Sequence, residues 1–169
     1  MEKESLERID NFVYKFLEAH VDRMPMRFVK LIANYYTDAR IRKLYYRRLH
    51  IFMDEGTFSN LGLFSTATEE APVIIGKNVS IAPNVSLISD SAPNNSMTLS
   101  ANRYVSEHLI KAQKIVIEDD VWIGSGVTIL PGVTVHARCV IGAGAVILED
   151  CEPDSIYAGV PAKKIRSLV

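Results

Sequence analysis

The stretch I-E-D-D-V-W-I-G-S-G-V-T-I-L-P-G-V-T-V-H-A-R-C-V-I-G-A-G-A-V-I-L-E-D-C-E, residues 117–152, decides the fold. When it is written in groups of six, the first residue of each group is Ile or Val, and the fifth is Val, Ala or Cys. Two earlier groups, I-G-K-N-V-S from Ile75 and I-A-P-N-V-S from Ile81, follow the same rule, and Leu87 opens a third. Nine groups that share one pattern indicate a hexapeptide-repeat solenoid.

The two fixed places have a direct physical meaning. In a parallel β-helix, three short strands form one triangular coil of about eighteen residues, and the first residue of each six points inward. That residue stacks on its counterpart one coil away, so stability comes from stacked neighbours and not from one collapsed core. The fifth residue must be small because it lies at a corner. We therefore predict a mainly β protein, folded as a parallel β-helix.

Both cysteines, Cys139 and Cys151, occupy the fifth place of their sixes. They are twelve residues apart, two thirds of a coil, so we expect them at different corners and not in a disulfide. No electropositive neighbour in the sequence marks either thiol as reactive. The pattern predicts two small buried hydrophobic side chains.

Residues 2–50 have another period. Apolar residues recur there at spacings of three and four, which is typical of amphipathic helices, and Pro25 fits the first turn of a second helix. We divide the chain into an N-terminal helical segment, residues 1–56, and a β-helix domain, residues 57–169, with a C-terminal tail.

The second part of the helical segment is rich in basic residues. They are Arg27, Lys30, Arg40, Arg42, Lys43, Arg47 and Arg48. A basic amphipathic helix can dock on a membrane surface. We prefer a solvent-facing or subunit-facing helix side as the explanation, because most such charge stripes are merely solvated.

Composition narrows the class of protein. The 169 residues carry a net charge of -1, which gives no reason to expect a nucleic-acid partner. The N-terminus M-E-K-E-S-L-E-R is polar and acidic, unlike a signal peptide, and no apolar run approaches the length of a membrane span. We expect a cytoplasmic protein of one domain's size.

The hexapeptide rule fails between Leu87 and Ile117. We predict a loop over residues 93–114 that is extruded from the coils, with a short helix within the stretch A-N-R-Y-V-S-E-H-L-I-K. A long excursion from a regular solenoid is not needed for stacking and is more often functional.

The stretches V-W-I-G-S-G-V-T-I-L-P-G-V-T-V, V-I-G-A-G-A-V and Y-A-G-V-P-A-K-K-I-R resemble the hexapeptide-repeat acyltransferases. The resemblance runs from about Ser59 to Arg166 and is greatest to the maltose and galactoside O-acetyltransferase branch. The N-terminal helical segment does not look like that of this branch. The resemblance implies a left-handed β-helix, a homotrimer and active sites in clefts between subunits.

It also implies acetyl-CoA as a cosubstrate, lying along the cleft. Ser125 and Ala143 match positions whose backbone groups meet the pantetheine arm, and Trp122 matches a tryptophan beside the thioester. Lys163 and Arg166 match basic residues that meet the adenosine phosphates, a role that suits their charge.

One position departs from the family. The branch often has Thr-Lys just before the acidic residue that corresponds to Asp150, whereas this chain has Leu148 and Glu149. A glutamate at that place would not favour a phosphate group, so the affinity and pose of CoA are expected to differ there.

The acceptor side departs more sharply. Asn84 in I-A-P-N-V matches an asparagine that contacts the acceptor sugar. In this branch a His-Pro pair follows, and its histidine takes the proton of the acceptor hydroxyl. Here Pro93 is kept, but Ala92 stands in the histidine's place.

Three accounts of this loss stay open. In the first, His108 of the loop replaces the missing base, oriented by Glu107 or Asp90; a positioned base contributes about 10²–10⁴ in rate. In the second, the acceptor is an amine, which needs no base because positioning carries most of the catalysis. In the third, the protein binds a ligand without turning it over.

The resulting hypothesis is an acetyl-CoA-dependent acyltransferase that modifies a small acceptor, a sugar hydroxyl or an amino sugar. Backbone amides near Ser125 would stabilise the thioester oxyanion. Carbonic anhydrases share the scaffold but need three histidines on zinc; only His136 on a coil and His108 in the loop are present, so no metal is expected. The alternative is a catalytically inactive trimeric protein that binds CoA or sugar, or serves as a scaffold.

Overall fold

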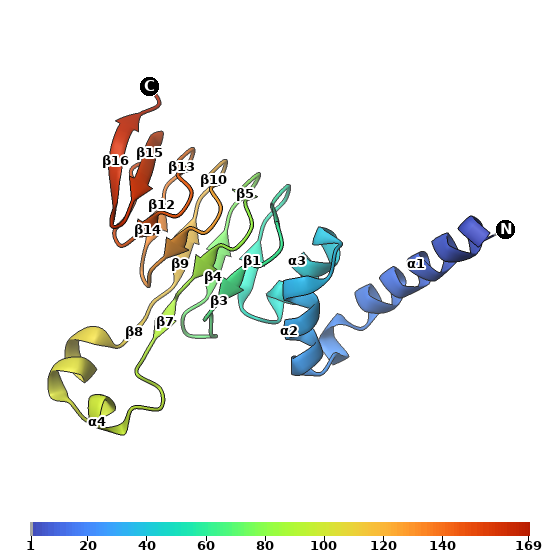
Figure 1. Cartoon of the computed structure of the whole chain (residues 1–169), viewed down its shortest axis with the longest axis horizontal. Coiled ribbons are helices and arrows are strands. Elements are labelled where there is room, and N and C mark those ends of the chain that lie inside the picture. The colour runs from blue at the N-terminus through green and yellow to red at the C-terminus, as the bar shows by residue number, and fades with distance from the viewer. Residues whose placement is uncertain (1) are drawn as a thin grey trace.

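The computed structural model describes residues 2–169, with side chains from residue 7 onward. Three helices come first: α2 and α3 lie at one end of a stack of strands and α1 projects away from it, while the C-terminal hairpin lies at the other end (Figure 1). The helices are α1 (Glu2–Ala19), α2 (Met26–Tyr35) and α3 (Ala39–Arg47), with a 3-10 turn at Val21–Arg23.

The strands form three parallel sheets, here called A, B and C, which the chain visits in turn. Sheet A contains β1 (Ile51–Met53), β4 (Val73–Ile75), β9 (Ile115–Ile117) and β12 (Thr134–Val135). Sheet B contains β2 (Phe58–Ser59), β5 (Ser80–Ile81), β10 (Trp122–Ile123), β13 (Val140–Ile141), β15 (Ser155–Gly159) and β16 (Ala162–Ser167). Sheet C contains β3 (Phe64–Ser65), β6 (Ser86–Leu87), β11 (Thr128–Ile129) and β14 (Val146–Ile147). The predicted left-handed parallel β-helix with helices before it is confirmed.

Both fixed places of the hexapeptide point inward. The first and fifth residues of every six from Ile117 to Cys151 are buried, in register with their counterparts one coil away. Cys139 and Cys151 are free and buried within this core, as the pattern predicted. Burial raises the pKa of both thiols, and that of Cys151 to about 12.

The first coil begins earlier than the sequence suggested. Strand β1 starts at Ile51 and pairs with β4, although the boundary between the segments was expected at residues 56 and 57. The first places of this coil hold Ser59 and Ser65 instead of aliphatic residues, so the hexapeptide rule does not reveal it. The division into two domains stays a prediction.

Helix α3 covers the open end of the stack. Its buried Arg42 donates hydrogen bonds to the carbonyl oxygens of Tyr36, Thr37 and Ser59. The buried Tyr46 hydroxyl donates to the carbonyl oxygen of Leu63, at 3.3 Å. Carbonyl groups at the end of a solenoid have no further coil to pair with, so a capping element must satisfy them.

The basic stripe of the N-terminal segment is largely engaged within the chain. Arg42 is buried, Lys43 donates to the carbonyl oxygen of Asp54, and Arg48 donates to that of Val21. Arg40 pairs with Asp38, the N-cap of α3, and this hydrogen bond lowers the pKa of Asp38 to about 2. No helix in the described part of the chain is long and apolar enough to cross a membrane.

The extruded loop leaves the stack between sheet C and sheet A. It rises on an antiparallel pair, β7 (Asp90–Ser91) and β8 (Lys111–Ala112), and projects well away from the coils (Figure 1). Its far part holds a short helix, α4 (Met97–Ser100), and a π-helical turn at Val105–Leu109. The turn lies within the stretch expected to be helical, residues 101–111, whereas α4 precedes that stretch.

Arg42→Ala is expected to lower the free energy of unfolding by about 3 kcal/mol, because the buried carbonyl group of Ser59 and the partly buried ones of Tyr36 and Thr37 lose their donor. Arg42→Met keeps most of the volume and tests the hydrogen bonds alone. The control Arg40→Ala removes an exposed guanidinium from the same helix and should cost less than about 1 kcal/mol. Urea unfolding at one protein concentration measures all three, and equal losses for Arg40→Ala and Arg42→Ala would contradict the capping role.

The two thiols are expected to resist modification in the native state. Because their pKa values are raised, they stay protonated at pH 8, and burial keeps reagents away. Reaction with a chromogenic disulfide reagent should be on the order of a hundredfold slower than in guanidinium-unfolded protein. A thiol that reacts at the same rate in both states would show that its corner is open.

Candidate active site

Three of the predicted site residues lie at one corner. Ser125 and Ala143 occupy the same place in successive turns between sheet B and sheet C, here called the B–C corner, and Asn84 lies at this corner one place further along its own turn, in register with Gly126. The amide of Gly144 donates to the carbonyl oxygen of Ser125 at 2.8 Å, and that of Gly126 donates to Pro83 at 3.0 Å. These hydrogen bonds hold the turns about 4.8 Å apart, as in any sheet.

The B–C corner offers free backbone donors. Among the described residues, the N–H groups of Ser125 and Ala143 make no backbone hydrogen bond, and both residues are exposed. Gly124 keeps the second group accessible, because a Cβ there would lie 2.6 Å from the nitrogen of Ala143. Two amides one coil apart can bind the carbonyl oxygens of an extended amide-containing ligand.

Asn84 has a clear structural role. Its φ of 60° lies in the left-handed region, which asparagine tolerates better than most residues, and its side chain lies against Gly62 of the preceding coil. Asn78 repeats the arrangement over Gly56 at another corner. Contact of Asn84 with an acceptor therefore stays a prediction, since corner geometry alone explains this residue.

Trp122 stands on the outer face of sheet B. It lies between Ser80 and Val140 in the neighbouring strands, and 59% of its surface is exposed. Ile123 beside it points into the core, so the alternation of the strand fixes the indole outward. The B–C corner follows directly, which places the indole and the free amide of Ser125 on the same coil.

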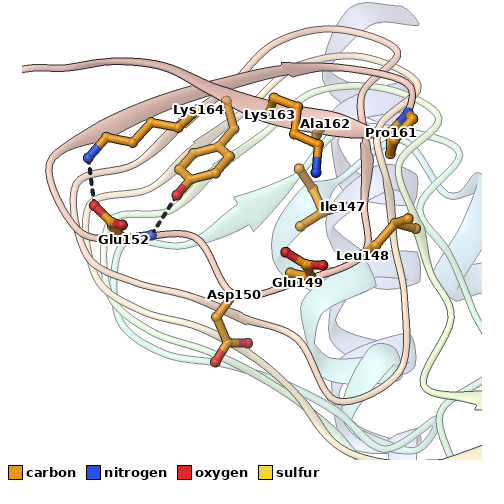
Figure 2. Close-up of a pocket in the computed structure, with 10 residues that line it drawn as sticks. Ile147, Leu148, Glu149, Asp150, Glu152, Pro161, Ala162, Lys163 and Lys164 are labelled. Atoms are coloured by element: carbon orange, nitrogen blue, oxygen red, sulfur yellow. Dashed lines mark hydrogen bonds and ion pairs between the residues drawn. The ribbon is translucent and has the colours of Figure 1, made fainter.

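The C-terminal hairpin, β15 and β16, extends sheet B beyond the last complete coil. A pocket of about 270 Å³ lies between this hairpin and the turn after β14 (Figure 2). Lys163 lines the pocket, whereas Arg166 is exposed on the same strand and does not. Within the described chain, the structure thus joins Lys163, but not Arg166, to the pocket.

The pocket has a mixed charge. Lys164 pairs with Glu152 at 2.6 Å, and this hydrogen bond lowers the pKa of Glu152 and raises that of Lys164. The Tyr157 hydroxyl accepts a hydrogen bond from the amide of Glu152, at 3.1 Å. Asp150 accepts one from the amide of Thr134, at 2.7 Å.

Three of these pocket residues, Glu152, Tyr157 and Lys164, were missed by sequence reasoning. Tyr157 lies within the Y-A-G-V-P stretch that carried the resemblance, so that motif was the available signal. The pairing of Lys164 with Glu152 depends on how the hairpin folds back, which no short-range pattern reveals.

His108 lies on the π-helical turn of the loop, fully at the surface. Its ring is 4.8 Å from that of Tyr104, centroid to centroid. Glu107 does not orient it, because Glu107 pairs with Arg103 at 2.7 Å. Asp90 lies half-buried at the base of the stalk, the name used here for the antiparallel pair β7 and β8. Within the described residues, no hydrogen bond joins Asp90 to His108.

The pairing of β7 with β8 joins the two arms of the loop that contains Ala92 and His108. Ser91 pairs with Lys111, so the next step of this register sets Ala92 opposite Ile110. His108 lies two residues before Ile110 in the chain. Ala92 and His108 thus belong to opposite arms of the same loop, and replacement of the family's histidine by His108 stays a prediction.

Within one chain the two halves of the candidate site are separated. The free amides and Trp122 belong to sheet B and the B–C corner, whereas the stalk leaves from the corner between sheets C and A. Sheet C lies between these corners, and the loop points away from the stack (Figure 1). Within one chain, the described residues of the two halves therefore do not form one site.

A different histidine does meet a carboxylate. His136 Nδ1 is 3.0 Å from Glu118 Oε1 at the corner between sheets A and B, and Glu118 also accepts the amide hydrogen of Ala137. The described residues contain no group of three or more acidic, histidine or cysteine side chains that suits a metal ion.

Comparison with known proteins agrees with this arrangement. Residues 114–149 match the family model of bacterial transferase hexapeptides, six repeats. The galactoside O-acetyltransferase of Escherichia coli is 31% identical over 169 residues, covering 92% of this chain and 75% of that protein. A Schizosaccharomyces pombe relative described as an acetyltransferase is 41% identical over 103 residues, and the chain spans about half (47%) of its length.

Among solved structures, a hexapeptide-repeat-containing acetyltransferase from Vibrio cholerae superposes with a TM-score of 0.66. It is 29% identical, and the match covers 92% of each chain. The coils are those of a hexapeptide-repeat protein, and the similarity to the E. coli enzyme extends across most of both proteins. The chain belongs to the hexapeptide-repeat acetyltransferases.

Proposed function

We propose that the protein is an acetyl-CoA-dependent O-acetyltransferase that acts on a small, sugar-like acceptor in clefts of a homotrimer. The observation that carries the proposal is the path of free amides at Ser125 and Ala143, one coil apart on the B–C corner. Ala158, which pairs with Lys163 in the hairpin, lies against Gly142 beside this corner. A donor with an amide-rich arm and a charged end fits such a path.

The donor assignment rests on the chemistry of this path. The pantetheine arm carries amide carbonyl groups, one of which the free amide of Ala143 can bind, and Lys163 offers a cation for its phosphate end. Trp122 supplies an apolar surface beside the thioester. The Vibrio cholerae acetyltransferase has also been solved with acetyl coenzyme A.

The reaction needs few protein groups. The acceptor hydroxyl oxygen attacks the thioester carbonyl carbon, forming a C–O bond, and the C–S bond then breaks. A neutral imidazole at His108 takes the hydroxyl proton and returns it to the departing sulfur. The free amide of Ser125 is the best candidate donor to the oxyanion of the intermediate.

A sugar-like acceptor is supported by the galactoside O-acetyltransferases of Escherichia coli and Lactococcus lactis among the relatives. Which sugar is used is left open by the chain's own residues. Because Ala92 removes the family's base, an amino sugar is the second candidate acceptor, since a neutral amine attacks without one. A CoA-binding protein without turnover is the third.

His108→Ala is expected to lower kcat for hydroxyl acceptors at least about a hundredfold, with the Kd for CoA unchanged, because the proton acceptor is lost. Free-thiol release from acetyl-CoA over a panel of sugar alcohols and amino sugars measures it. His136→Ala is the matched control, because that histidine lies at another corner and pairs with Glu118.

If only amines react and His108→Ala has the kcat of wild type, the reaction needs no base. An amino sugar then replaces a sugar hydroxyl as the proposed acceptor. If CoA binds but no acceptor in the panel is modified, the result favours a CoA-binding protein without turnover. Equal losses in His108→Ala and His136→Ala would point to damage to the fold and not to a role of the imidazole.

Mixing two inactive variants tests the shared site. Co-expressed His108→Ala and Gly124→Val chains should regain part of the wild-type activity, because some clefts would combine an intact loop with an intact B–C corner. Gly124→Val is chosen because it fills the space beside the Ala143 amide. Mixed oligomers that stay as inactive as each variant would show that loop and corner of one site come from the same chain.

A further inference from the structure

The pocket under the C-terminal hairpin contains one unpaired cation and one unpaired carboxylate. Among the described residues, neither Lys163 nor Glu149 forms an ion pair, whereas Lys164 is paired with Glu152. Asp150 is engaged by the backbone amide of Thr134. Figure 2 shows Lys163 and Glu149 directed toward the same hollow from opposite sides.

Their placement follows from the fold. Lys163 lies in β16, directly opposite Ala158 of β15, at the start of the returning strand. Glu149 lies two residues beyond β14, in the exposed turn that leaves the last coil. The exposed Leu148 precedes it, so this side of the pocket offers no second cation.

An anion that approaches Lys163 must therefore also approach Glu149. The pocket holds about 270 Å³, which is the size of a few small polar groups, so a phosphate bound to the lysine lies within one Debye length of the carboxylate. The attraction of the phosphate to Lys163 is offset by its repulsion from Glu149. A phosphate of high charge therefore adds little binding free energy in this pocket.

We propose that Glu149 is a specificity-determining residue that weakens the hold of this protein on the phosphate end of its acyl donor. The inference rests on the proposed function, because it takes the donor to lie along the B–C corner with that end at Lys163. Donor binding then depends chiefly on the pantetheine arm, and donors with fewer phosphate groups bind nearly as well as acetyl-CoA.

The test measures Kd by isothermal titration calorimetry for three probes: acetyl-CoA, acetyl-dephospho-CoA and acetyl-pantetheine. Glu149→Gln should tighten acetyl-CoA about threefold to tenfold at low salt, and this gain should shrink as ionic strength rises. It should leave acetyl-pantetheine unchanged, because that probe has no phosphate group. The ratio of the Kd for acetyl-dephospho-CoA to the Kd for acetyl-CoA should be smaller in wild type than in Glu149→Gln.

Glu69→Gln is the matched control. It removes the same charge from an exposed carboxylate in the first coil, at the other end of the stack. Lys163→Gln locates the phosphates: it should weaken acetyl-CoA but not acetyl-pantetheine.

Two failures are distinguishable. If acetyl-CoA binds and Glu149→Gln behaves like Glu69→Gln, or if Lys163→Gln has no effect, the inference is overturned while the transferase assignment stands. If neither wild type nor any variant binds acetyl-CoA or acetyl-pantetheine, the proposed function itself fails, and the inference falls with it.

Discussion

Hydrogen bonding between successive coils is the constraint on which everything else depends. Because each strand pairs with the strand one coil away, a residue at a given place always lies above its counterpart. The aliphatic first place becomes an internal column, and the same rule stacks Ser125 and Ala143 along one outer corner. A row of evenly spaced backbone donors on the outside is thus a direct consequence of how the inside is packed.

The backbone groups at the two ends of a strictly periodic stack have no further coil to pair with, and the chain covers the two ends in different ways. At the N-terminal end, α3 inserts the buried Arg42 and Tyr46 against carbonyl groups of the first coil. At the C-terminal end, β15 and β16 continue sheet B without completing another coil. The first solution closes the core, whereas the second leaves a pocket that the proposed donor site uses.

The sequence predicted the periodic part of the molecule well, since one inward residue per strand leaves a visible rule. It did not reveal the first coil, because α3 covers that end and Ser59 and Ser65 are tolerated there. It named Lys163 and expected Glu149 to disfavour a phosphate group, but it did not show that both line one pocket, which depends on the hairpin folding back over β14. It offered Glu107 or Asp90 as the residue that orients His108, whereas the structure pairs Glu107 with Arg103, a loop contact that no period dictates.

The stalk formed by β7 and β8 has a wider consequence. The excursion enters and leaves the solenoid through two paired strands, so its twenty or so residues touch the stack only at their base (Figure 1). Changes in the length or sequence of this segment need not disturb any coil. The part of the surface that carries His108 can therefore diverge rapidly in evolution while the amide column stays fixed, which lets one scaffold acquire new acceptors by exchanging a single insert.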